Sequence, residues 1–111
     1  MNKSSLLQDL IATYEKHGWR LSQVLLKPET RAELLPTIEA HSQVIEAREA
    51  EFDALWFSRP SHQNREAWEL RLLAETQYAL FETFESDETE EQRREVKLEM
   101  ESRLRDYANR S

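Results

Sequence analysis

The pattern of hydrophobic and polar residues changes its period at Gly18, the only glycine of the chain. Residues 5–17 place apolar side chains every three to four positions, which predicts a helix, and Ser5 with Gln8 has the spacing of a capping box at its start. Residues 19–26 alternate instead, which predicts a strand. Because glycine readily adopts the left-handed conformation that ends helices, we expect Gly18 to have a positive φ and to end the first helix.

The segment that follows combines a helix signal with an ambiguous stretch. Pro28 suits the first turn of a helix, and we expect this helix to end before Pro36, because the residue preceding a proline avoids helical angles. Residues 37–51 contain good helix formers, yet part of the stretch alternates as an edge strand would. We favour an extended, edge-like segment at 42–48.

Residues 52–84 predict a three-stranded antiparallel meander. An aromatic-rich run at 52–58 ends in a cluster of turn-forming residues, and alternating runs follow at 68–72 and 78–84 across a short loop. In the run at 68–72, the alternation predicts side chains that face the core and side chains that face away. The former are Trp68, Leu70 and Leu72, and the latter are Glu69 and Arg71.

The C-terminal part of the chain predicts a long helix. Asp87 and Glu90 have the spacing of a helix cap, and acidic residues suit the first turn of a helix. A narrow apolar stripe should dock this helix onto the domain, or form a seam with the same helix of a second copy. The stripe consists of Val96, Met100, Leu104 and Tyr107.

These elements together predict one α+β domain over residues 1–111. We expect two layers, in which an antiparallel sheet of about four to five strands packs on one face against the N- and C-terminal helices. The alternative is a mostly α-helical bundle, which would require residues 37–57 to form one long helix.

Charge and composition narrow the classes of partner. The net charge of −7 has the wrong sign for covering phosphates or for binding an anionic membrane, so we expect neither nucleic acid nor membrane as a partner. The sequence has neither a signal-peptide core nor an apolar run long enough to span a bilayer, and we expect a cytoplasmic protein. It also has no cysteine, which excludes disulfides and cysteine-ligated metal sites.

Motifs for catalysis and metal binding are missing from the sequence. His17, His41 and His62 lie far apart and lack the spacing of metal ligands. One glycine cannot form a glycine-rich phosphate loop, and no serine lies in a nucleophile elbow. We therefore expect no metal and no cofactor, we assign no catalytic residue, and the sequence leans against an enzyme.

The candidate binding residues lie in and around one predicted hairpin, where positive charge and large rings gather in an otherwise acidic chain. They are Trp56, Arg59, His62, Arg65, Trp68 and Arg71. Tryptophan and arginine are enriched at interaction hot spots. The competing interpretation is that the tryptophans fill the core and the arginines only solubilise a loop.

Two functions follow from this hairpin. The first is a non-catalytic protein-interaction module of a chaperone-like, immunity-like or regulatory kind. Its protein partner is unidentified, and a homodimer is an open alternative. The alternative is a small-molecule-binding protein or small enzyme with a pocket between sheet and helices. In that pocket Arg59, Trp68 and Arg71 would hold an anionic ligand.

Overall fold

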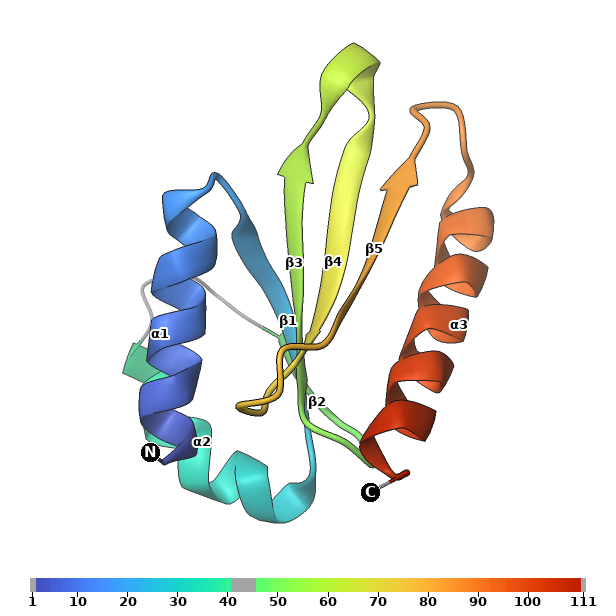
Figure 1. Cartoon of the computed structure of the whole chain (residues 1–111). Coiled ribbons are helices and arrows are strands. Elements are labelled where there is room, and N and C mark those ends of the chain that lie inside the picture. The colour runs from blue at the N-terminus through green and yellow to red at the C-terminus, as the bar shows by residue number, and fades with distance from the viewer. Residues whose placement is uncertain (1, 41–45, 111) are drawn as a thin grey trace.

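A five-stranded mixed sheet forms the centre of the molecule, with helices on either side of it (Figure 1). The computed structural model describes residues 2–40 and 46–110. The strand order is β2-β1-β3-β4-β5; β1 and β2 are parallel and the other pairs are antiparallel. In chain order the elements are α1 (Lys3–Lys16), β1 (Arg20–Leu26), α2 (Pro28–Ala40), β2 (Glu46–Glu49), β3 (Ala54–Pro60), the short 3₁₀ helix η1 (His62–Asn64), β4 (Glu66–Leu72), β5 (Ala79–Phe84) and α3 (Glu90–Ala108).

The α+β class is confirmed, as are a sheet of four to five strands and the packing of the terminal helices against it, whereas the helical bundle is wrong. The sheet is mixed and not antiparallel throughout as we expected, because α2 connects β1 to β2 as a crossover and the two strands run parallel. The structure corrects one detail of the layering. We expected both terminal helices on one face, but α1 and α2 pack on Leu55 and Phe57 while α3 packs on Ala54 and Trp56. These residues form a continuous apolar run in β3, and such a run is typical of a strand that is buried on both faces.

The first helix ends where the sequence predicts. Gly18 has a φ of +85°, and β1 begins two residues later, so both expectations are confirmed. The predicted cap at the other end is wrong. The side chain of Asn2 caps the helix by accepting a hydrogen bond from the Ser5 N–H at 2.8 Å, and α1 therefore begins at Lys3.

Helix α2 continues past the point at which we expected it to end. Pro36 lies inside the helix, although an internal proline removes a backbone hydrogen bond. Leu34 and Ile38 are both buried against the sheet on either side of Pro36, and this tertiary packing offsets the lost bond. The extended edge segment is confirmed at Glu46–Glu49; its first part, 42–45, lies outside the described residues.

The meander of β3, β4 and β5 is confirmed, and so is the docking of the C-terminal helix. Leu70 and Leu72 are buried under α3, and Trp68 is half-buried there. The predicted stripe of α3 faces the sheet, with Met100 and Leu104 buried.

The cap at the start of α3 differs from our prediction. Thr89 and Gln92 form a reciprocal capping box, so Asp87 and Glu90 do not cap it. Glu69 and Arg71 lie on the opposite face of β4, as we expected, but that face also carries part of the core and is not open to solvent. Glu69 accepts a hydrogen bond from the hydroxyl of Tyr14 in α1, and Arg71 is half-buried.

Candidate binding groove beside α3

The six binding residues predicted from the sequence lie in three separate places. Trp56 and Trp68 face α3, Arg59 and Arg71 lie on the face that carries α1, and His62 and Arg65 lie at the tip of the β3–β4 hairpin. The cause is the period of a strand, because residues of opposite parity point to opposite faces of a sheet. Their role in binding stays a prediction.

The charged members of this set already have partners within the protein. Arg59 donates a hydrogen bond to the backbone oxygen of His17 at 2.9 Å, and its guanidinium lies 4.5 Å from the ring centroid of Trp19. Arg65 Nε lies 2.5 Å from a carboxylate oxygen of Glu85, as an ion pair without the alignment of a hydrogen bond. Arg71 Nε donates to a backbone oxygen at 3.1 Å. These contacts favour a structural role for the arginines.

A groove of about 860 Å³ runs along α3, and we call it the α3 groove. Helix α3 packs over β4 and β5, which leaves the same face of β1 and β2 open beside it. Trp56 and Trp68 form part of its lining on the strands. Four basic and four acidic residues also line it, so its lining is neutral although the whole chain carries −7.

Glu101 fixes α3 to the strands beneath the groove. One of its carboxylate oxygens accepts from Arg48 Nη2 at 2.5 Å and from Trp56 Nε1 at 2.9 Å. Its side chain is only 15% exposed, and hydrogen bonds to an ionised group are stronger than neutral ones. This carboxylate therefore ties the edge strand β2 and the central strand β3 to α3, and its role is structural.

Lys97 lies over Trp68 in the wall of the groove. Its Nζ is 3.4 Å from the ring centroid, the geometry of a cation–π contact. Burial lowers the pKa of Lys97 from its ordinary 10.5, and the carboxylate of Glu66 only partly opposes this effect. That carboxylate is paired with Arg93 instead, at 2.8 Å. Within the described part of the chain, Lys97 is a half-buried cation that forms no ion pair.

Two further side chains at the groove are free to contact another molecule. Arg94 is exposed, and its side chain forms no ion pair or hydrogen bond with the residues that the structure describes. Leu98 is 53% exposed, so its apolar side chain is accessible to another molecule. The groove thus offers an aromatic and aliphatic surface next to two unpaired cations.

The sequence interpretation missed the helix side of this groove, although a signal for it exists. Arg94, Lys97, Leu98 and Glu101 follow at i, i+3, i+4 and i+7, which places them on one face of α3. That face lies beside the apolar stripe that docks the helix. A second mixed face next to a docking stripe is the pattern that could have drawn attention to α3.

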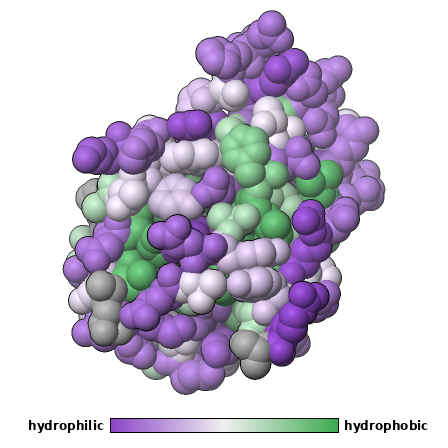
Figure 2. Space-filling view, viewed as in Figure 1, coloured by the Kyte–Doolittle hydropathy of each residue, from purple (hydrophilic) through white to green (hydrophobic). Residues whose placement is uncertain are grey.

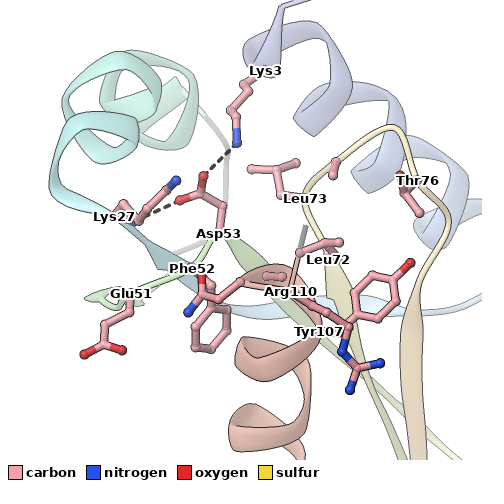
Figure 3. A pocket seen from close by; sticks show the side chains of 13 residues that line it. Lys3, Lys27, Glu51, Phe52, Asp53, Leu72, Leu73, Thr76, Tyr107 and Arg110 are labelled. Atoms are coloured by element: carbon pink, nitrogen blue, oxygen red, sulfur yellow. Dashed lines mark hydrogen bonds and ion pairs between the residues drawn. The ribbon is translucent and has the colours of Figure 1, made fainter.

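A smaller pocket of about 400 Å³ lies between the N-terminus of α1, the start of β3 and the C-terminal end of α3 (Figure 3). Asp53 is buried at its edge and accepts from Lys3 Nζ at 2.7 Å, from the Lys27 N–H at 2.9 Å and from Thr30 Oγ1 at 2.9 Å. Figure 3 shows Lys3 and Lys27 meeting at this carboxylate, with Tyr107 across the pocket. The carboxylate of Asp53 therefore joins α1 and α2 to the start of β3 and has a structural role.

Comparisons with known proteins assign no family or function to the chain. No protein-family model matches the chain, and no curated protein or solved structure does either. Across residues 2–40 and 46–110, no three histidine, cysteine or acidic side chains gather where they could hold a metal ion. No helix in this part of the chain has the length and apolar character needed to cross a bilayer.

Proposed function

We propose that this protein is a protein-interaction module that holds a polypeptide partner in the α3 groove. One observation carries the proposal: the groove places an exposed Leu98 and the unpaired cations Arg94 and Lys97 beside the indole of Trp68. Interaction hot spots combine large rings, arginine and an apolar anchor in this way.

The residues that line the groove indicate which side chains a partner needs. An acidic side chain of the partner would pair with Arg94, and an apolar side chain would pack on Leu98 and against Trp68. The rest of the partner should be neutral or basic, because a chain of net charge −7 repels a strongly acidic protein at long range. The same net charge disfavours a nucleic acid, so we propose a protein partner. The cytoplasm stays the proposed compartment.

The test uses a matched pair of charge reversals on α3. Arg94→Glu changes the groove, whereas Arg103→Glu makes the same change at an exposed position of α3 that does not line the groove. Both variants and the wild type are used to capture partners from the source cell, after thermal unfolding has shown that all three melt alike. We expect Arg94→Glu to recover at least about tenfold less of one partner than the wild type, whereas Arg103→Glu recovers a normal amount. A tenfold loss of affinity corresponds to about 1.4 kcal/mol of binding free energy. Equal recovery by all three proteins contradicts the proposal.

A second arm of the same experiment tests the hairpin predicted from the sequence. The double substitution Arg59→Ala/Arg65→Ala removes the two arginines without touching the groove. Selective loss of a partner here, together with normal capture by Arg94→Glu, would move the contact to the hairpin.

A small anionic ligand is the second candidate occupant, and the half-buried cation Lys97 favours it. Of the three residues that we predicted to hold such a ligand, only Trp68 lines the groove. Titration with inorganic phosphate and with citrate, followed by tryptophan fluorescence in a Trp19→Phe background, tests this function. A saturable change that Lys97→Gln abolishes supports a ligand, because Lys97 contacts the Trp68 ring.

A further inference from the structure

Strand β5 forms one outer edge of the sheet and carries an exposed aromatic ring. β5 pairs with β4, and no other described strand lies beside it. Phe81 is 57% exposed, and its ring meets Trp19 edge to face at 6.2 Å between centroids. Figure 2 shows apolar side chains gathered over β5, with hydrophilic residues around them.

The backbone of β5 presents groups to this edge that no described neighbouring strand binds. The Leu72 N–H donates to the Tyr78 oxygen, so these two residues form a hydrogen-bonded pair of the antiparallel ladder. Such pairs recur at every second position, and the next ones in β5 are Leu80, Glu82 and Phe84. The backbone groups of Ala79, Phe81 and Thr83 therefore point away from β4. In agreement with this direction, the Thr83 N–H is bound by the side chain of Glu82, at 3.0 Å.

The two edges of the sheet differ in protection. β2, at the other edge, has charged side chains at three of its four positions, Glu46, Arg48 and Glu49. Charged residues on an edge strand discourage pairing with another chain. β5 has six residues, of which one is charged, Glu82, and it contains neither lysine nor proline. Its edge is thus open to a further strand.

We propose that the β5 strands of two copies pair antiparallel, about a twofold axis at Phe81, and join the two sheets into one. In this register each Phe81 lies opposite Phe81 of the second copy, and each Ala79 lies opposite Thr83. All three residues direct their backbone groups outward, so the hydrogen-bonding directions match once the Thr83 N–H exchanges the Glu82 carboxylate for the Ala79 oxygen of the second copy.

The side chains in this register are also self-complementary, which favours a second copy over a foreign strand. Glu82 lies opposite Leu80, so the one charge of each strand does not face its equivalent. The two exposed Phe81 rings become cross-strand neighbours. A twofold interface of this kind uses the same patch on both subunits, as most homodimers do. This surface is separate from the α3 groove, so the inference does not depend on the proposed function.

The first test is sedimentation equilibrium of the full chain from about 1 to 500 μM, a range that covers weak dimers. We expect a monomer–dimer equilibrium that tightens at high salt, because two copies of charge −7 repel each other and salt screens the repulsion. Phe81→Glu should weaken dimerisation at least tenfold, while Leu35→Glu, a matched change at an exposed leucine of α2, should leave it unchanged. A monomer at all concentrations overturns the proposal, and so does a dimer that Leu35→Glu disrupts and Phe81→Glu does not.

The second test traps the pairing register and does not depend on the stability of a charged variant. The chain has no cysteine, so Phe81→Cys introduces a single thiol. Opposed residues of a hydrogen-bonded antiparallel pair have Cα atoms about 5.5 Å apart, a separation that a disulfide spans. Mild oxidation should link Phe81→Cys into a covalent dimer at least tenfold faster than Leu35→Cys, which has its thiol on an exposed position of α2. Equal rates for the two variants overturn the proposed register.

Discussion

The carboxylate of Asp53 offers the sharpest test of how α1, α2 and the sheet are joined. It is 4% exposed and accepts hydrogen bonds from Lys3 Nζ, the Lys27 N–H and Thr30 Oγ1. Asp53→Ala removes both acceptor oxygens and with them three hydrogen bonds, and it leaves a buried hydroxyl and a backbone N–H without a partner. We expect a large loss of stability from this one substitution.

The magnitude follows from the burial of the donors. Each buried donor left unpaired costs about 1–3 kcal/mol, and Thr30 is only 4% exposed. The Lys3 side chain is 39% exposed, so water replaces most of its interaction and it adds little. The sum for Asp53→Ala is about 3–5 kcal/mol, within the range found when one partner of a buried pair is removed. Asp53→Asn keeps one carbonyl oxygen as an acceptor and should lose about half as much.

Urea unfolding followed by circular dichroism measures this loss, with Glu51→Ala as the control. Glu51 lines the same pocket but is exposed, and its replacement should change the free energy of unfolding by less than about 0.5 kcal/mol. The reasoning is refuted if Asp53→Ala unfolds within about 1 kcal/mol of the wild type, because a saturated buried acceptor cannot be removed at so small a cost.

Two further predictions concern α1. Gly18→Ala should lower the free energy of unfolding by about 1 kcal/mol, because alanine is strained at a φ of +85°, although a Cβ there would meet no atom within 4 Å; chemical denaturation checks this, and an unchanged midpoint contradicts it. For Tyr14, burial first and the hydrogen bond to Glu69 second raise the pKa of the phenol to about 12. Because the unfolded chain ionises this phenol near pH 10, its contribution to stability is complete below that pH. The contribution is then lost between pH 10 and 12, by at most about 2.7 kcal/mol. Unfolding of Tyr14→Phe should lack this alkaline decline, and parallel pH profiles of the two proteins would contradict the assignment.

Local signals in the sequence were sufficient for much of the fold. The change of period at Gly18 marks the end of α1, and the alternation around Leu70 identifies a strand of the meander. The course of α2 past Pro36 could not be predicted in this way, because it depends on the burial of Leu34 and Ile38 against strands that are distant in the sequence. Tertiary packing there outweighs a local preference.

The candidate site was predictable only in part for a similar reason. Trp68 was singled out, but its neighbour Lys97 comes from another element, and nothing local in the sequence places the two side chains in contact. The assumption that nearby residues share a site also fails in a strand. Arg71 is three residues from Trp68 and therefore lies on the opposite face of the sheet.

Photo-crosslinking from the groove tests the proposed function most directly. A benzophenone amino acid is placed at Leu98, at the groove, and in a second protein at Arg103, an exposed position of the same helix outside the groove. After irradiation in the source cell, the account predicts a covalent adduct with a distinct polypeptide from position 98 and none from position 103. No adduct from position 98, or the same adducts from both positions, would contradict the assignment of the α3 groove as the binding surface.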